Sequence, residues 1–171
     1  MTSIVRASVA DAELLSKLGK TTFIESHGKS ASEANIESYV NLKYSQNACV
    51  VELQNSDNIF YLLYHNEKAI GYSKIILNVP DANIPIKNVT KLERFYVLQD
   101  YHNLKLGWEL FNYNLIYSKN QQQAGMWLYT WTENQKAINF YTKAGFKIIG
   151  NYDFKITETH SNPNYQMLLT Y

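Results

Sequence analysis

The sequence is poor in the residues that build disulfide frameworks and metal centres. It contains one cysteine, Cys49, which excludes an intrachain disulfide and a metal site made of thiolates alone. The four histidines are dispersed and show no spacing typical of metal ligands. We therefore expect no metal cofactor.

An excess of charge of one sign is also missing. Lys and Arg number 16 against 15 Asp and Glu, which gives a formal net charge of +1, and the basic residues are scattered rather than massed. The long-range positive field that dominates association with nucleic acids is therefore absent. A DNA or RNA partner is not expected.

Long hydrophobic runs are absent as well. No apolar stretch approaches the ~18 residues that a membrane span requires. The opening residues, MTSIVRASVADAELL, lack the basic segment and following apolar segment of a secretory signal. The sequence thus predicts a cytoplasmic protein without membrane association.

The chain also offers few places at which it could divide. Its three prolines and seven glycines form no linker, and no repeat is visible. A chain of 171 residues with 46% hydrophobic content can bury one substantial core but hardly two. A single domain covering 1–171 is expected.

Alternating strand and helix patterns predict an α/β (α+β) fold. Ser8 and Asp11 form a capping box before a stripe of leucines, and Gly145 is the expected cap at the end of a later helix. The predicted strands are 3–7, two runs within 59–79 joined by a hairpin at 65–68, 89–98, 125–131, 147–156 and 164–171, and the predicted helices are 8–23, 31–42, 46–54, 106–119 and 134–146. The hairpin is antiparallel, whereas the strand–helix–strand unit 89–131 should be parallel. We expect a mixed, mostly antiparallel, twisted sheet of about seven strands with helices on both faces.

The turn between strand 89–98 and the helix that begins near Lys105 is the first candidate site. A helix N-terminus carries free N–H groups and partial positive charge, which suit a pyrophosphate. The turn holds one glycine, Gly107. An ordinary connection between a strand and a helix is the alternative.

The second candidate is the aromatic pair Phe140 and Tyr141, two turns into the helix that begins at Asn134. A phenol is protonated at neutral pH and could give its proton to a departing thiolate. The alternative makes both residues core aromatics of an amphipathic helix.

The third candidate is Glu93, in the strand segment KLERFYV. Period-two alternation predicts that Glu93, Phe95 and Val97 share one face of the strand. A carboxylate partly desolvated there would have a raised pKa and could accept a proton from an ammonium group. The alternative is an ion pair with a neighbouring cation such as Lys91 or Arg94.

Together these stretches resemble the GNAT superfamily of acetyl-CoA-dependent N-acetyltransferases. That family shows a strand ending in Y-V-L, a Q/R-x-x-G-x-G/A turn that opens a helix, and a later N-x-x-A-x-x-F-Y-x-x-x-G-F. LERFYVLQDYHNLKLG corresponds to the first two parts, and NQKAINFYTKAGF matches the third at every defining position. The segments IVRASVADAELLSKLGKTTFIESHG and LERFYV further resemble the bacterial polyamine-type (spermidine/spermine) branch.

The resemblance implies an acyltransferase with acetyl-CoA as cosubstrate and no metal. The backbone of Phe95, Tyr96 and Val97 would pair with the pantetheine arm, and the Val97 amide would polarise the acetyl carbonyl. Asn134 would hydrogen-bond the pantetheine region, Tyr141 would protonate the leaving thiolate, and Glu93 would activate the amine. The residues expected to wrap the pyrophosphate are His102, Asn103, Leu104, Lys105, Leu106 and Gly107, with Trp108 just behind them.

The turn departs from the family pattern at two positions. His102 stands at the Q/R position, and Lys105 stands at the first glycine position. A positive φ at Lys105 would cost about 1 to 2 kcal/mol, whereas a charge-assisted hydrogen bond from its ammonium is worth about 1.5 to 3. We expect binding to be retained.

The predicted function is transfer of an acetyl group to the primary amine of a small, polyamine-like molecule. The alternatives are a CoA-binding module without turnover and an acetyltransferase acting on protein lysines or N-termini. Glu25, Glu33 and Glu37 are the candidate carboxylates for binding a polyamine. A homodimer is the commonest form of soluble oligomers and is a further possibility here.

Overall fold

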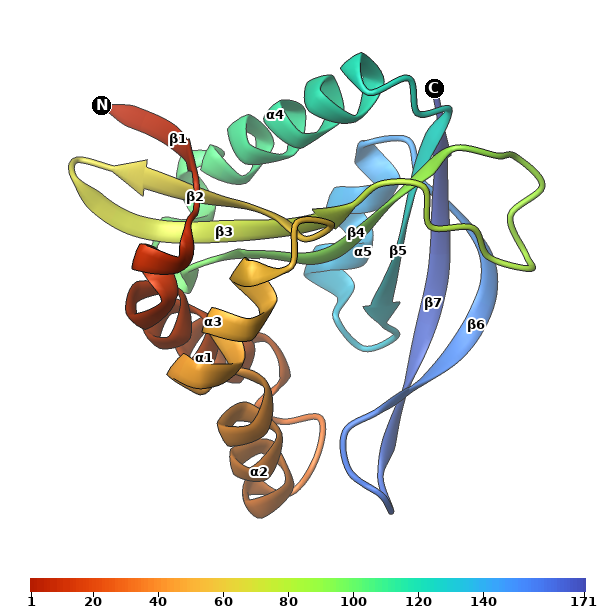
Figure 1. Cartoon of the computed structure of the whole chain (residues 1–171). Coiled ribbons are helices and arrows are strands. Elements are labelled where there is room, and N and C mark those ends of the chain that lie inside the picture. Colours follow the sequence, from red (N-terminus) through yellow and green to blue (C-terminus); the bar gives the residue numbers. More distant parts are fainter.

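The computed structural model describes residues 1–171 and contains one seven-stranded sheet with the strand order β1-β2-β3-β4-β5-β7-β6 (Figure 1). All neighbouring strands are antiparallel except β4 and β5, which are parallel. The strands are β1 Thr2–Arg6, β2 Ile59–His65, β3 Lys68–Ile76, β4 Val89–Val97, β5 Gly125–Trp131, β6 Lys147–Lys155 and β7 Ser161–Thr170. The predicted mixed, mostly antiparallel sheet is confirmed.

Five α-helices accompany the sheet at the predicted places. They are α1 Ala12–His27, α2 Glu33–Lys43, α3 Gln46–Gln54, α4 Leu106–Asn120 and α5 Gln135–Lys143, and short 3-10 helices cover Val9–Asp11 and Gln99–Leu104. Side chains cap three of the α-helices, since Ser32, Ser45 and Asn134 each accept a hydrogen bond from a backbone N–H in the first turn. The predicted hairpin between β2 and β3 is confirmed, and Asn66 and Glu67 form its two-residue turn with φ of 47° and 65°.

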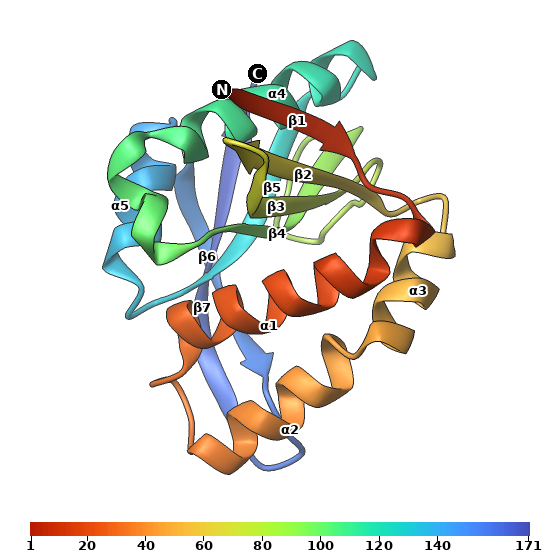
Figure 2. The ribbon, with the colours of Figure 1, turned by 90° about the vertical axis from the view of Figure 1, so that its left-hand side faces the viewer.

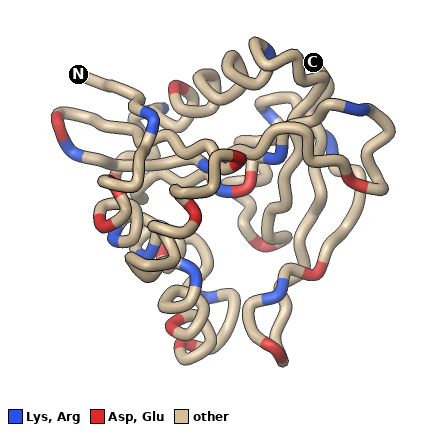
Figure 3. The backbone as a smooth tube through the Cα atoms, in the orientation of Figure 1, with Lys and Arg blue, Asp and Glu red and all other residues tan.

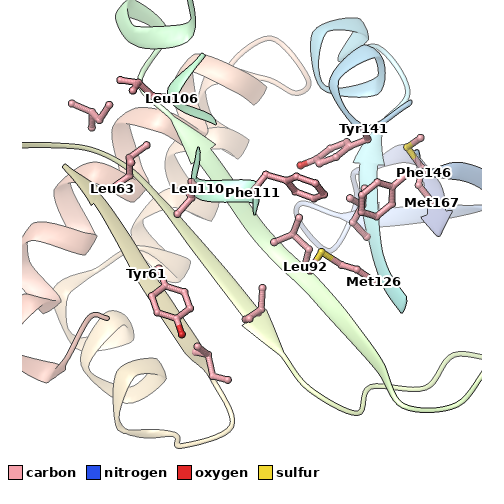
Figure 4. Close-up of a cluster of buried hydrophobic side chains, with 14 residues drawn as sticks. Tyr61, Leu63, Leu92, Leu106, Leu110, Phe111, Met126, Tyr141, Phe146 and Met167 are labelled. Atoms are coloured by element: carbon pink, nitrogen blue, oxygen red, sulfur yellow. The ribbon is translucent and has the colours of Figure 1, made fainter. Parts of the chain in front are cut away.

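The helices lie on both faces of the sheet, as predicted. In Figure 2, α1, α2 and α3 lie on one side of the strands, and α4 and α5 lie on the other. Each face has its own buried cluster. One cluster includes Leu110, Phe111 and Tyr141 from α4 and α5 (Figure 4), and the other includes Leu15 and Phe23 from α1. Burial of these apolar side chains on two faces fixes the sheet between its helices.

Strand β4 contains a bulge that overturns the predicted alternation of its side chains. Lys74 on β3 pairs with Arg94, but the next residue, Ile75, pairs with Leu92, so Glu93 is the extra residue on β4. Leu92 therefore packs in the same cluster as Phe95 and Val97, on the face where alternation placed Glu93.

The two parallel strands separate beyond the bulge. Pairing between β4 and β5 is limited to Val89, Thr90 and Lys91 with Gly125, Met126 and Trp127. Strand β5 continues to Trp131 paired with β7 alone, and β4 continues to Val97 paired with β3 alone. A V-shaped opening thus forms between the C-terminal halves of β4 and β5.

Charged residues are distributed over the whole backbone, and neither sign gathers on one face in Figure 3. None of the helices has both the length and the hydropathy that a membrane crossing needs.

Candidate active site

A cavity of about 700 Å³ lies at the V-shaped opening. Of the thirteen residues predicted for the site, ten line it: Glu93, Phe95, Tyr96, Val97, His102, Lys105, Gly107, Trp108, Asn134 and Tyr141. Asn103, Leu104 and Leu106 do not line it, and the side chain of Leu106 is buried in the core beneath α4 instead. The fold therefore brings together most residues of three stretches that are distant in the sequence.

The backbone of β4 presents an unpaired edge to this cavity. The Leu98 N–H donates to the carbonyl of Ile70 at 2.7 Å, so Leu98 faces β3. Adjacent residues of a strand direct their N–H and C=O groups to opposite edges, and Val97 therefore faces the opening. The N–H of Val97 is directed into the space that β5 has left.

The turn before α4 is held by side chains rather than by glycines. The Nε2 atom of His102 lies 2.7 Å from the carbonyl oxygen of Val97, and its Nδ1 atom lies 2.7 Å from the ammonium of Lys136. Because an ammonium can only donate, Nδ1 accepts the hydrogen bond from Lys136. The hydrogen of the neutral ring is then on Nε2, which donates to the Val97 carbonyl. Both ring nitrogens of His102 are thus engaged within the protein.

Lys105 adopts a left-handed conformation, with φ of 58° and ψ of 13°, directly before the first residue of α4. Lys105 therefore has the positive φ that a glycine at this position would adopt without strain. At Gly107, an added Cβ would contact only Phe140 at 3.8 Å and Val97 at 3.9 Å, both ordinary distances. Packing within the chain therefore does not require glycine there, and the space before it is open.

Asn134 caps α5, and its side-chain oxygen accepts from the N–H of Ala137 at 3.1 Å. Its amide NH₂ group donates no hydrogen bond within the chain and remains available in the cavity. Next to the turn, the rings of Trp108 and Phe140 lie 4.4 Å apart. These two rings form an apolar wall of the cavity.

Tyr141 belongs to the core and to the cavity at once. Its side chain is buried beside Phe95 and Phe146, as Figure 4 shows for Phe146, while the residue also lines the opening. Burial raises the pKa of its phenol above the ordinary value. The group is therefore protonated at every physiological pH.

Glu93 lies in a network of ion pairs, which corrects the predicted environment. Its oxygens lie 3.0 Å from the ammonium of Lys74 and 3.6 Å from that of Lys91. Burial alone would raise the pKa of Glu93, but the two ammonium groups outweigh it and lower that pKa. The predicted raised pKa is wrong, and the alternative of an ion pair with a neighbouring cation is correct.

The network extends to α3 through residues that the sequence pattern did not reveal. Glu52 lies 2.7 Å from Arg94 and 2.9 Å from Lys74, and the Arg94 guanidinium stacks on Tyr44 at 4.8 Å from the ring centre. The side chains of Lys74 and Arg94 are only 6% and 10% exposed. Alternation within β4 could not have placed these partners, because they come from α3 and β3.

The far half of the cavity is walled by aromatic rings. Phe23 and Tyr39 stack at 4.6 Å between ring centres, and Tyr96 and Trp131 line the opening between the strands. His27, the last residue of α1, stacks on Phe23 at 4.7 Å. Burial lowers the pKa of His27 to about 4.

The three carboxylates predicted to bind a polyamine do not lie together in the structure. Glu25 lines the cavity, and one of its oxygens accepts from the N–H of Gln99 at 2.9 Å. Glu33 and Glu37 are exposed on α2 and do not line the cavity. No cluster of three or more His, Cys, Asp or Glu side chains has the arrangement of a metal site.

Comparison with known proteins gives consistent matches. The sequence model of the acetyltransferase (GNAT) family matches residues 21–146. An uncharacterized N-acetyltransferase of Mycobacterium bovis is 25% identical over 90% of this chain and 94% of its own length. The spermidine N(1)-acetyltransferase of Thermoplasma acidophilum is 26% identical over 85% of this chain and 88% of its own length.

Solved structures share the fold along its whole length. The PaiA N-acetyltransferase of Thermoplasma acidophilum, solved in complex with coenzyme A, superposes with a TM-score of 0.79 at 24% identity, covering 100% of this chain and 99% of that one. The ribosomal-protein-S18-alanine N-acetyltransferase of Escherichia coli gives a TM-score of 0.66 at 18% identity, covering 99% and 94%.

Proposed function

This chain belongs to the acetyltransferase (GNAT) family, and from that premise we propose that it transfers the acetyl group of acetyl-CoA to the primary amine of a small molecule. The observation that carries the proposal is the opening between β4 and β5, where the N–H of Val97 and the phenol of Tyr141 face one cavity. An N–H donor for an oxyanion and a proton donor for a thiolate are the two groups that this acyl transfer needs.

The cosubstrate fits the unpaired edge of β4 and the turn that follows it. The backbone of Phe95, Tyr96 and Val97 would pair with the pantetheine arm, and the free amide of Asn134 would support it from α5. The pyrophosphate would lie before Gly107, where the chain leaves space, at the N-terminus of α4. Lys105 and Lys136 both line the cavity and supply positive charge to that place.

His102 has a positioning role rather than the phosphate contact that the family motif implied. Its two hydrogen bonds join the carbonyl of Val97 to Lys136. The turn is thereby fixed to β4, and the ammonium of Lys136 is held beside the turn. The imidazole of His102 thus orients both the edge of β4 and Lys136, a residue that would contact the phosphate.

The reaction begins when a neutral amine attacks the acetyl carbonyl carbon. The Val97 N–H stabilises the negative charge that develops on the carbonyl oxygen. The carbon–sulfur bond then breaks, and Tyr141 gives its proton to the thiolate. Burial raises the pKa of the phenol, but a thiolate formed in the same apolar surroundings is destabilised in the same way, so their difference in basicity stays small.

Glu93 supports the reaction through its charge. Its lowered pKa keeps it ionised, and its pairing with Lys74 and Lys91 holds the bulge of β4 beside the cavity. A proton accepted by this carboxylate would weaken both ion pairs. Removal of the amine proton falls to another group.

A polyamine-like acceptor is the candidate substrate class. The named activity of the Thermoplasma relative supports it. Within the cavity, the faces of Tyr39 and Trp131 can attract an ammonium, and Glu25 is the carboxylate with an oxygen not used in a hydrogen bond. A chain with several amines could place one nitrogen at the opening and a second, charged one against these groups.

Release of free thiol from acetyl-CoA tests the proposal directly. The purified chain is incubated with acetyl-CoA and, separately, with spermidine, an aromatic monoamine, and peptides bearing a free lysine or a free N-terminal alanine. We expect release with spermidine, and release at least about 10-fold slower when Tyr141→Phe replaces the wild type. Release only with a peptide would support acetylation of proteins. Binding of CoA in calorimetry without release in any arm would instead indicate a module without turnover.

A further inference from the structure

The carboxylates beside the reaction centre are already engaged. Lys74 and Lys91 hold Glu93, and Arg94 and Lys74 hold Glu52, with all four nitrogen–oxygen distances between 2.7 and 3.6 Å. A proton accepted by either residue would weaken two ion pairs in a largely buried network. Neither Glu93 nor Glu52 is therefore suited to accept the proton of the attacking amine.

His27 lies at the mouth of the opening between the strands. Its ring centre is 6.1 Å from that of Tyr96 on β4 and 6.0 Å from that of Trp131, the last residue of β5. Val97, whose N–H faces the same opening, is the neighbour of Tyr96 in sequence. The imidazole thus lies where the two strands are apart, in the half of the cavity opposite the turn that would hold phosphate.

The ring of His27 has no side-chain hydrogen-bond partner within the protein. Its buried Nδ1 atom makes no hydrogen bond of good geometry, and the one group that acts on it is the Phe23 backbone one turn earlier, which raises the pKa of the imidazole against the larger effect of burial. A hydrogen on Nδ1 faces the Phe23 carbonyl best, which leaves the lone pair on Nε2. The Nε2 atom is not buried, and the residue lines the cavity.

We infer that His27 accepts the proton of the attacking amine through Nε2, an assignment that rests on the proposed acetyl transfer. The amine nitrogen forms its bond to the acetyl carbon, and the carbon–sulfur bond breaks. The nitrogen becomes an amide, and a protonated amide nitrogen is far more acidic than an ammonium, so a weak base suffices. One proton passes from nitrogen to His27, and one passes from Tyr141 to sulfur.

The cycle closes when the proton on His27 returns to the Tyr141 phenolate. The ring of Tyr96 neighbours His27, and Tyr96 lines the same cavity as Tyr141. The Tyr96 hydroxyl or a water molecule can carry the proton. The sum is one amine and one thioester converted into one amide and one thiol.

The surroundings of His27 keep it neutral over the working range of pH. From β4 the titratable group that faces it is the Tyr96 phenol, and from β5 and α1 its neighbours are Trp131 and Phe23, which do not titrate. No charged side chain contributes to its pKa, which burial lowers to about 4. The lone pair is therefore available at neutral pH.

His27→Phe tests the assignment, because a phenyl ring keeps the stacking on Phe23 and lacks the nitrogen. We expect kcat with the best acceptor to fall about 100-fold, within the range typical of a lost general base, at an unchanged KM for acetyl-CoA. His65→Gln is the matched control, since His65 lies at the β2/β3 hairpin outside the cavity. That variant should keep wild-type kcat.

A second variant separates a chemical role from a structural one. His27→Ala leaves a space that free imidazole can fill, and imidazole should restore at least a tenth of wild-type kcat without affecting His27→Phe. A kcat of His27→Phe within threefold of wild type would overturn the assignment. So would a folded His27→Ala that keeps the wild-type KM for acetyl-CoA and gains nothing from imidazole. Failure of the wild type itself to release thiol would refute the proposed function instead.

Discussion

The buried imidazole of His27 should make the stability of this protein fall between pH 7 and pH 5, whatever reaction it catalyses. Burial lowers its pKa from 6.5 to about 4 in the folded chain. As the pH falls below 6.5, the unfolded chain binds a proton that the folded chain does not bind until the pH approaches 4. Stability is therefore lost across this window and is fully retained above it.

The magnitude follows from the two pKa values. At pH 5 the unfolded imidazole is almost fully protonated, whereas His27 in the folded chain remains about nine-tenths neutral, and linkage gives a loss of about 2 kcal/mol relative to pH 7. That loss is a large share of the ~5 to 15 kcal/mol by which domains are usually stable. It should be visible as a lower midpoint of urea unfolding.

The variant His27→Phe isolates this contribution, because phenylalanine does not titrate. Urea unfolding of both proteins is followed by circular dichroism at pH 7 and pH 5. Other titrating groups act alike in both chains, so the stability advantage of the variant should grow by about 2 kcal/mol at the lower pH. At pH 7 the variant should be no less stable, since it also removes an unpaired buried nitrogen. If the stability difference between the variant and the wild type were the same at both pH values, the lowered pKa of His27 would be refuted.

Substitutions at three further residues address the other groups of the site. Tyr141→Phe should keep the affinity for acetyl-CoA and lower kcat by roughly 10- to 10⁴-fold, since only proton donation is removed; steady-state kinetics with calorimetry checks this. Lys105→Ala and Lys105→Gly should both weaken CoA binding in calorimetry, by about 1 to 3 kcal/mol, and flatten its salt dependence; tighter binding by the glycine variant would show that the lysine only crowds the ligand. Glu93→Gln should cost about 1 to 2 kcal/mol at pH 7, because Lys74 keeps only Glu52 as a partner. Since the pKa of Glu93 is lowered, its stabilisation is present above the unfolded value and is lost as the pH falls through the folded one, so wild type and variant should converge in acid urea melts.

Local patterns predicted the elements well because each carried its own physical signal. Helical spacing of leucines, the capping box of Ser8 and Asp11 and a polar turn between two β-rich runs do not depend on distant residues. The positive φ of Gly145, 100°, is of the same local kind. The parallel pairing of β4 with β5 followed from the helix between them.

The bulge at Glu93 could not be predicted, because it is a property of a strand pair. Alternation assumes one residue opposite each partner, and an inserted residue moves every preceding side chain to the other face. Alternation therefore assigns Glu93 to the apolar face, and it reveals neither Lys74 on β3 nor Glu52 on α3, which belong to the same network. A residue from each of three elements forms this network, and only the fold brings them together.

His27 and Lys136 were missed for a related reason. His27 is the last residue of an amphipathic helix, and Lys136 lies in the first turn of another, where a basic residue has no special pattern. Each becomes informative through a neighbour that is remote in sequence, Tyr96 for His27 and His102 for Lys136. Such residues become apparent only in the fold, where a polar atom in a cavity lacks a partner or holds another group in place.

In the proposed function, the turn before α4 would bind the pyrophosphate with one glycine. Glycines let the backbone approach a ligand closely, and a Cβ at Lys105 gives up part of that approach at a cost of about 1 to 2 kcal/mol for its left-handed backbone. In exchange, Lys105 and Lys136 line the same cavity as Gly107, and His102 ties the turn to the carbonyl of Val97. In the proposed complex, movement of the turn on binding phosphate would pass through this imidazole to the carbonyl of Val97, the residue whose N–H faces the opening. The glycine-poor turn would therefore couple the binding of the cosubstrate to the geometry of its reacting end, which a flexible glycine loop would not do.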